Sequence, residues 1–267
     1  MDVTDRSLPS IPSLPNLRDV GGYPTRGGSR VCTGVLYRSG ALDSLAPEDE
    51  PAFDALGIRT VYDLRSAFER IDHPDPELPG AENVVIDMMG LVAGTNPNAI
   101  EQAMADTAAG QDVTGDDGGL SLFAAHYREF VTFPSARRSL GRLFGDLAGD
   151  NVAPALVHCM GGKDRTGWAI AALLTLLDVA PDDVMADYLL TNARLVSMQD
   201  WLADDFRMRG GPPDMVDVVL QARPQYLDSA LDEMRKVYGD ARGYFTSGLG
   251  LDPAQVESLR GRFLDGG

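Results

Sequence analysis

A cysteine and an arginine are separated by five residues in the segment HCMGGKDRTG, residues 158–167. Cys159 follows an apolar run that is typical of a buried strand, and Arg165 opens an apolar run that is typical of a helix. A short loop in this place leaves main-chain N–H groups free at the positive end of a helix dipole, where they bind anions. Gly161 and Gly162 permit positive φ and a close approach of backbone to ligand. The segment therefore predicts a phosphate-binding loop.

The two end residues of the loop indicate the reaction. The guanidinium of Arg165 can bind two phosphate oxygens at once. The same cation, the N–H groups and the helix dipole favour the thiolate of Cys159, which is then poised for in-line attack on phosphorus. Thr166 can donate a hydrogen bond to the sulfur when it leaves. The residues expected to bind the phosphate are Met160, Gly161, Gly162, Lys163, Asp164 and Arg165.

Other residues are expected to support the loop. We expect His158 to hydrogen-bond the backbone behind it and to fix its shape, rather than to act as a general base. Arg38 ends a predicted strand near the carboxyl edge of the sheet. The residues expected to form a hydrogen-bonded support network are Asn16, Arg18, Asp19, Asp63, Arg65 and Glu69. Cys32 has no comparable surroundings and is expected to be inert. The three histidines show no metal-ligand spacing, which predicts no metal site.

Strands that alternate with helices must hold this loop in place. Short apolar runs predict strands at 31–40, 59–65, 83–88 and 153–159. An apolar helix is predicted at 165–178. Further helices are predicted at 47–56, at 120–148 with a division at Pro134, and at about 182–209, 214–238 and 253–264. This order predicts an α/β domain of three layers with a helical C-terminal part.

Two segments depart from this pattern. Residues 1–15 are rich in Ser and Pro and are expected to form a flexible lead-in. The segment of about 89–119 is rich in Gly, Ala, Asp and Asn, which predicts a long mobile insertion with a short helix at 98–107. Such an insertion is either a lid over a site or a plain surface loop. We expect one domain over residues 1–267, whose helical part begins at about 182.

Composition excludes several classes of protein. The formal net charge of −17 repels nucleic acids. The longest apolar run, Trp168 to Leu177, is only about ten residues long, too short for a membrane span. The N-terminus has no apolar signal core, so a cytoplasmic location is the default, with secretion by a leaderless route left open. The oligomeric state is not indicated.

The segment HCMGGKDRTG resembles the signature loop of cysteine-dependent protein tyrosine phosphatases, HC-x5-R-[ST]. More narrowly, it is similar to an atypical bacterial branch that carries K-D-R in this loop. The likeness runs from NLRDVGGY (16–23) through GIRTVYDLRSAFE (57–69) to the last helix. It implies a mostly parallel four-stranded sheet flanked by helices, a mobile helical lid, and no metal or organic cofactor. Cys159 resembles the family's nucleophile and Arg165 its phosphate clamp.

A phosphatase of this kind needs a proton donor for the leaving oxygen. Ordinary members of the family use an Asp in a W-P-D loop, and this chain has no such sequence. We favour Asp164, beside the clamp. Asp87, at the end of a predicted strand, and the lid residues Asp116 and Asp117 remain alternatives. Asp63 has a similar position to Asp87, but we expect it to pair with Arg65 or Arg18.

Lys163 places a second cation on the loop, which suits either an extra phosphate, as on an inositol ring, or a solvated side chain. We therefore expect hydrolysis of phosphotyrosine through a cysteinyl-phosphate, with phosphoserine, phosphothreonine and phosphoinositides left open as further substrates. The alternatives are a phosphatase that prefers phosphoinositides, a catalytically weak module that binds phosphorylated partners, and a protein that transfers sulfur or arsenate. The expected partner is a phosphorylated protein or phosphoinositide.

Overall fold

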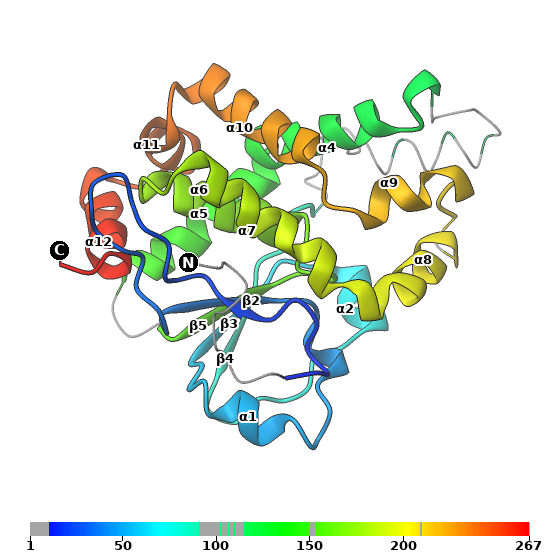
Figure 1. Cartoon of the computed structure of the whole chain (residues 1–267), viewed down its shortest axis with the longest axis horizontal. Coiled ribbons are helices and arrows are strands. Elements are labelled where there is room, and N and C mark those ends of the chain that lie inside the picture. The colour runs from blue at the N-terminus through cyan, green and yellow to red at the C-terminus, as the bar shows by residue number, and fades with distance from the viewer. Residues whose placement is uncertain are drawn as a thin grey trace.

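A mostly parallel sheet forms the centre of the computed structural model (Figure 1). The structure describes residues 11–90, 102, 106, 109, 115–149, 153–208 and 210–266. The sheet has five strands in the order β1-β2-β5-β3-β4. The strands are β1 (Arg18–Asp19), β2 (Leu36–Ser39), β3 (Thr60–Asp63), β4 (Glu82–Val85) and β5 (Ala155–His158). The last four are parallel, as the sequence predicts, and β1 adds a short antiparallel edge that is too brief to give a periodic pattern.

The register of the three middle strands brings their polar ends together. His158 in β5 lies level with Ser39 in β2 and with Asp63 in β3. All three residues are the last of their strands and are buried. The carboxyl edge of a parallel sheet is where α/β folds place their functional groups. The predicted phosphate-binding loop starts at this edge.

Helices cover the sheet unequally. The large helices α4 (Leu120–Thr132), α5 (Pro134–Ala148), α6 (Arg165–Leu176), α7 (Pro181–Arg194) and α10 (Pro224–Tyr238) lie on one side in Figure 1. The other side carries the short helix α1 (Glu50–Asp54). Within the described ranges, the other α-helices with defined bounds are α2 (Ala67–Asp72), α8 (Gln199–Met208), α9 (Val216–Leu220), α11 (Ala241–Gly243) and α12 (Pro253–Phe263). The predicted α/β class is confirmed.

Proline marks the start of several helices. Pro134 is the first residue of α5, so the predicted division of 120–148 is confirmed. The single helices predicted for 182–209 and 214–238 are wrong. The first is interrupted after Arg194 by a 3₁₀ turn, Val196–Met198. The second is interrupted before Pro224, because proline disfavours helix in the residue that precedes it.

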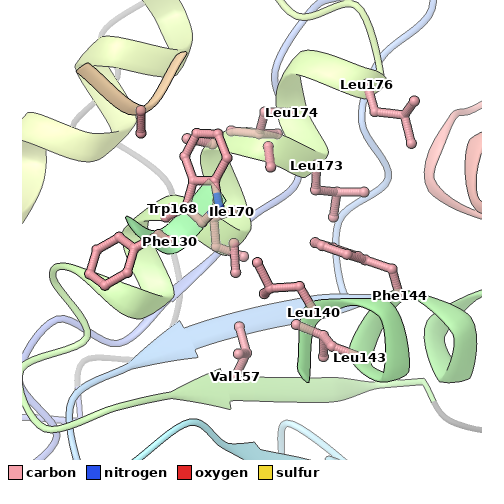
Figure 2. Packing of buried hydrophobic residues seen from close by; sticks show 14 of the residues in the cluster. Phe130, Leu140, Leu143, Phe144, Val157, Trp168, Ile170, Leu173, Leu174 and Leu176 are labelled. Carbon is pink, nitrogen blue, oxygen red and sulfur yellow. The ribbon is translucent and has the colours of Figure 1, made fainter. Parts of the chain in front are cut away.

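The main core joins α6 to the sheet. All but two residues of α6 are buried, which explains why this helix is apolar nearly all round. Figure 2 shows Trp168, Ile170 and Leu173 of α6 packed with Phe144 of α5 above Val157 of β5. A second cluster fills the opposite face of the sheet. The loop that precedes α6 is therefore anchored at both ends in rigid structure.

The predicted lead-in and insertion lie largely outside the described residues. Of the lead-in, residues 11–15 are described, and Ile11 and Leu14 are buried in the second cluster, so this part is packed rather than flexible. Of the predicted helix at 98–107, only residues 102 and 106 are described, and both are helical. At the end of the insertion, a 3₁₀ turn, Gly115–Asp117, leads into α4. No helix among the described residues is long and apolar enough to cross a membrane.

Candidate active site

The loop between β5 and α6 has its carbonyl groups turned toward the protein. The carbonyl oxygens of Gly161 and Gly162 each accept a hydrogen bond from Asn16 Nδ2 at 3.0 Å. Gly162 O also accepts from Arg38 Nη2 at 2.6 Å. Met160 O accepts from a main-chain N–H of the segment after β2. None of the described hydrogen bonds is donated by the N–H groups of residues 160–164, so these donors remain for an anion.

Gly162 is required by the loop's close approach to β2. Its φ is +62°, and a Cβ atom there would lie 2.1 Å from the carbonyl oxygen of Ser39. Gly161 differs, because a Cβ atom at this position would make an ordinary contact with Leu195 Cδ1 at 3.6 Å. Of the two glycines, only Gly162 has both positive φ and no room for a side chain.

Cys159 lies at the base of this loop with only 2% of its surface exposed. Burial lowers the pKa of Arg38 to about 10, although the charges of Asp187 and Cys159 oppose this shift. Burial would also lower the pKa of Arg165, but the charges of Glu69, Cys159 and Asp164 raise it. Two guanidiniums therefore act electrostatically on the predicted nucleophile. Thr166 is buried, and its hydroxyl has no hydrogen-bond partner among the described residues. Such a hydroxyl suits the predicted donor to the departing sulfur, because burial without a partner is otherwise costly.

Arg165 is held on one edge by Glu69. Its Nη1 and Nη2 donate to Glu69 Oε2 and Oε1 at 2.7 and 2.6 Å, and Nη1 also reaches Leu64 O at 3.4 Å. A guanidinium has five N–H groups, so Nε–H and one proton of Nη2 remain, parallel to each other. Burial would lower the pKa of Arg165, but Glu69, Cys159 and Asp164 raise it. Glu69 thus fixes the orientation of these two remaining donors, as the predicted binding of phosphate oxygens requires.

Glu69 is itself fixed by the start of α2. Its side chain accepts from Ser66 N at 2.8 Å, and Ser66 Oγ accepts from Glu69 N, which completes a capping box. Burial would raise the pKa of Glu69, but Arg165 and Ser66 lower it to about 2. The sequence predicted Glu69 as part of the support network but did not indicate its partner, because Arg165 lies 96 residues further along the chain.

Lys163 and Asp164 form a pair that docks on α4. Lys163 Nζ lies 2.7 Å from Asp164 Oδ1 and 5.2 Å above the ring of Phe123. Only 5% of Lys163 is exposed, so the interpretation of a solvated lysine is wrong. Asp164 Oδ1 also accepts from the hydroxyl of Tyr127 at 2.6 Å. This role of Tyr127 was not predicted from the sequence. The signal was its position one helical turn after Phe123, on the same face of α4.

The other candidate acids lie in different surroundings. Asp87 is half-buried two residues beyond β4, and its Oδ1 accepts from Met89 N. Burial raises the pKa of Asp87, while Arg70, main-chain donors and Arg165 oppose this shift. A raised pKa suits a proton donor, so Asp87 remains the alternative. Asp117 caps α4 through Ser121 and is exposed, and its neighbour Asp116 is also exposed.

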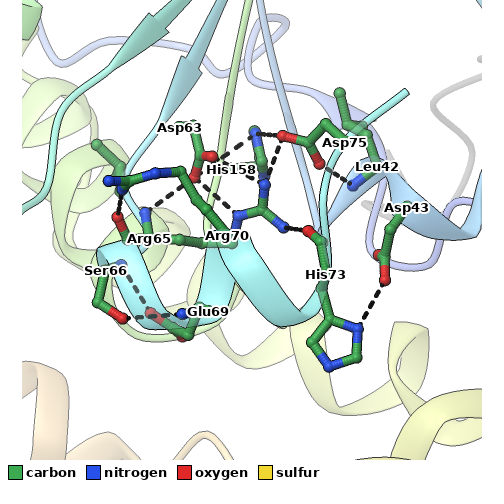
Figure 3. A network of polar contacts seen from close by, with 12 residues as sticks. Leu42, Asp43, Asp63, Arg65, Ser66, Glu69, Arg70, His73, Asp75 and His158 are labelled. Carbon is green, nitrogen blue, oxygen red and sulfur yellow. Dashed lines mark hydrogen bonds and ion pairs between the residues drawn. The ribbon is translucent and has the colours of Figure 1, made fainter. Parts of the chain in front are cut away.

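His158 lies among carboxylates instead of hydrogen-bonding the backbone as predicted. Its Nε2 is 3.4 Å from Asp75 Oδ2 and 3.9 Å from Asp63 Oδ1 (Figure 3). Arg65 pairs with both carboxylates, at 2.8 Å from Asp63 and 2.6 Å from Asp75. The side chains of His158, Asp63 and Asp75 bring possible metal-ligand atoms within 4.8 Å of one another. Because the Arg65 guanidinium already balances both carboxylates, this buried cluster is a support beneath the loop.

A second buried cluster supports the loop from the side of α7. Asp187 accepts from Arg38 Nη1 at 2.7 Å, from Arg18 Nε at 3.1 Å and from Tyr23 Oη at 3.0 Å. Burial would raise the pKa of Asp187, but the two arginines hold it far below its usual range. The predicted supports Arg18 and Arg38 therefore meet here. Asp187 was not predicted from the sequence, although a carboxylate in the buried stripe of a helix signals a buried partner.

The charge of Glu69 gives a testable pH dependence of stability. Its pKa falls from an ordinary 4.5 to about 2 on folding, so its ionised form stabilises the folded state above pH 4.5. This contribution is lost as the pH falls from about 4.5 to about 2. We expect Glu69→Gln to lower the free energy of unfolding at pH 7, and the difference from wild type to shrink across that window. Denaturant titration at several pH values measures it.

The control is Glu48→Gln, which changes an exposed glutamate. We expect no such window for that variant. A difference between wild type and Glu69→Gln that stays constant from pH 7 to pH 2 would contradict the ion pair's contribution.

The fold and this loop define a class of protein, the phosphatases that use a Cys-x5-Arg loop between a strand and a helix. A family model described as the tyrosine phosphatase family matches residues 9–265, and the chain belongs to this family. The protein is accordingly a phosphatase enzyme.

Named relatives agree with the family. The chain is 31% identical over 266 residues to a Cupriavidus necator protein provisionally named a tyrosine-protein phosphatase, covering 95% of this chain and 87% of the relative. It is 28% identical over 279 residues to the triple specificity protein phosphatase PtpB of Mycobacterium tuberculosis, covering 95% and 98%. It is 24% identical over 238 residues to a tyrosine-protein phosphatase of Nostoc commune, covering 87% and 75%.

Proposed function

We propose that the protein removes phosphate from phosphotyrosine in proteins through a cysteinyl-phosphate intermediate. The observation that carries this proposal is the loop itself. Its carbonyl oxygens accept hydrogen bonds from the surrounding protein, away from the centre of the loop. Its N–H groups donate no hydrogen bond among the described contacts, and Cys159 lies at its base. Arg165 adds two parallel N–H groups, those of Nε and Nη2, from an edge that Glu69 does not occupy. Such a ring of donors matches the three equatorial oxygens of the phosphoryl group in the transition state of its transfer.

The first step forms a bond between Cys159 Sγ and phosphorus. The bond from phosphorus to the tyrosine oxygen breaks, and that oxygen takes a proton from Asp164. Asp164 directly precedes Arg165, and its described hydrogen bonds all fall on Oδ1. Oδ2 is therefore the oxygen that carries the proton. General acid catalysis of this kind contributes typically about 10²–10⁴-fold to the rate.

The second step returns the enzyme to its starting state. Water attacks the phosphorus of the cysteinyl-phosphate, Asp164 takes a proton from this water, and the bond from sulfur to phosphorus breaks. The hydroxyl of Thr166, which has no partner among the described residues, donates to the departing thiolate. Inorganic phosphate is the product.

Two observations favour phosphoproteins over lipids as substrates. Lys163 is buried and paired with Asp164, so a second phosphate would have to break this pair to bind it. The net charge of −17 opposes approach to an anionic membrane surface, where phosphoinositides reside. The relative from Mycobacterium tuberculosis is named for triple specificity, so phosphoserine, phosphothreonine and phosphoinositides belong in any test.

The test compares phosphate release from four kinds of substrate at equal concentration and without added metal. These are a phosphotyrosyl peptide, the matching phosphoseryl and phosphothreonyl peptides, and soluble phosphoinositides that differ in the number of ring phosphates. We expect kcat/KM to be highest for the phosphotyrosyl peptide. Higher values for the phosphoinositides, rising with the number of ring phosphates, would overturn this assignment of substrate and support the lipid alternative.

A further inference from the structure

A chain of buried hydroxyl groups ends on Asp164. Tyr127 Oη, from α4, lies 2.6 Å from Asp164 Oδ1. Tyr188 Oη, from α7, lies 2.7 Å from Tyr127 Oη. Both tyrosines are almost completely buried. Burial raises the pKa of each hydroxyl well above its usual value, and the nearby charge of Asp164 adds to the shift. Both hydroxyls therefore stay protonated over the whole working pH range.

The direction of these hydrogen bonds is fixed by their last acceptor. An ionised carboxylate can only accept, so the proton of Tyr127 points to Asp164. The oxygen of Tyr127 must then accept from Tyr188. Lys163 donates to the same carboxylate oxygen. Oδ1 thus accepts hydrogen bonds from two donors, the ammonium of Lys163 and the buried phenol of Tyr127. An oxygen that already accepts two hydrogen bonds is a poor place for the proton of the acid.

The ring of Tyr127 is held in a fixed position by its neighbours. Its centroid lies 5.0 Å from that of Phe130, 5.5 Å from Tyr226 and 6.1 Å from Tyr188. The three neighbours come from three different helices. Contacts on three sides of a fully buried ring hold it in place. Replacement by phenylalanine would therefore remove the hydroxyl and leave the ring in place.

We propose that Tyr127 is the positioning residue of the general acid: by occupying Oδ1 of Asp164, it places the reactive proton on Oδ2 and orients it toward the leaving oxygen. This inference rests on the proposed role of Asp164 as the acid. Without Tyr127, only Lys163 still donates to Oδ1, and a single donor holds the carboxyl group less firmly against rotation about its Cβ–Cγ bond. A proton that points away from the leaving oxygen cannot be transferred to it, even when the pKa of the acid suits the reaction.

The charged and titratable groups around Asp164 set the expected pH effect. They are Lys163 on the loop, Arg165 on α6, Tyr127 on α4, Tyr188 on α7 and Tyr226 on α10. Of these, only Lys163 and Tyr127 donate to the carboxylate in the described contacts. Loss of the Tyr127 donor disfavours the ionised form, so the basic limb of the rate profile should move to higher pH.

The experiment uses a series of aryl phosphates whose phenols differ in acidity. Proton donation matters most for a weakly acidic phenol, so the slope of log kcat/KM against leaving-group pKa reports on the acid. For Tyr127→Phe we expect about a 10-fold loss with phenyl phosphate, the value of one hydrogen bond, and little loss with a nitrophenyl phosphate. The plot of log kcat/KM against leaving-group pKa should become steeper, and the basic limb of the pH–rate profile should move to higher pH. Tyr188→Phe should give a smaller change in the same direction.

Tyr226→Phe is the matched control. This ring packs on Tyr127, but its hydroxyl donates to Val218 O instead of the site. We expect the wild-type slope for this variant. An equal loss for every phenol in Tyr127→Phe and Tyr226→Phe would mean a purely structural role and would overturn the inference.

Asp164→Asn separates this inference from the function on which it rests. If Asp164→Asn steepens the slope strongly and Tyr127→Phe leaves it unchanged, the acid assignment stands and the inference is wrong. If Asp164→Asn keeps the wild-type slope and Asp87→Asn steepens it, both the acid assignment and the inference are overturned. A steeper slope in both Asp164→Asn and Tyr127→Phe supports the inference.

Discussion

Cys159→Ser should lower the rate of phosphate release by roughly 10⁵-fold or more, the scale seen when a covalent nucleophile is lost. A serine hydroxyl stays protonated at neutral pH, whereas a cysteine can react as the thiolate. Cys159 is 2% exposed, and Arg165 and Arg38 both interact with its charge. The oxygen that replaces the sulfur therefore lies in the same place but is a far weaker nucleophile. Release of inorganic phosphate from a phosphotyrosyl peptide measures the loss.

The control for this variant is the second cysteine. Cys32 lies in the segment before β2, and burial, with Asp265, raises the pKa of its thiol. We expect Cys32→Ser to keep the wild-type rate. We also expect Cys159→Ser to retain phosphate binding, because the N–H groups and Arg165 are unchanged. Near wild-type turnover in Cys159→Ser would show that the cysteinyl-phosphate mechanism is wrong.

Arg165→Lys has the second largest expected effect, a fall in kcat/KM of about 10³-fold. A lysine ammonium is a point charge and cannot offer two parallel N–H groups in one plane. In this site it would also turn toward Glu69, whose carboxylate already holds the Arg165 guanidinium from 2.6 and 2.7 Å. The positive charge is kept, so the measurement isolates geometry from charge. Steady-state kinetics with phenyl phosphate gives the value.

Arg142→Lys serves as the matched control for this substitution. Arg142 is a largely solvent-facing residue of α5, where its contact with Asp146 is long, at 3.8 Å. We expect wild-type kinetics from it. We expect the melting temperature of Arg165→Lys to stay near wild type, since the introduced ammonium can still pair with Glu69. Activity of Arg165→Lys within about tenfold of wild type would contradict the role of the two parallel donors, whose loss should cost far more.

Local signals in the sequence were sufficient for the loop and its surroundings. The run ALVHC, the glycines and the apolar run after Arg165 each follow from neighbours in sequence, and the structure has the strand, the loop and the helix in that order. Pro134 likewise marked the start of α5 correctly. Features of this kind depend on backbone preference and periodicity, which a single sequence contains.

Contacts between distant residues could not be predicted in the same way. Glu69 and Arg165 are 96 residues apart, Arg38 and Asp187 are 149 apart, and only the folded chain brings them together. The predicted partner of His158 was wrong for the same reason, since Asp75 lies in an irregular segment with no periodic pattern. Asp187 could have been suspected from its place in a buried helical stripe, but its two arginine partners could not.

The shared role of Glu69 couples the reactivity of the site to the local stability of α2. The carboxylate that orients Arg165 also completes the N-terminal capping box of a helix only 6 residues long. A helix of this length has little stability of its own, and its first turn is held by that box. When the first turn frays, the guanidinium loses its fixed orientation in the same event. The orientation of the proposed phosphate clamp, Arg165, therefore depends on the local stability of this short helix.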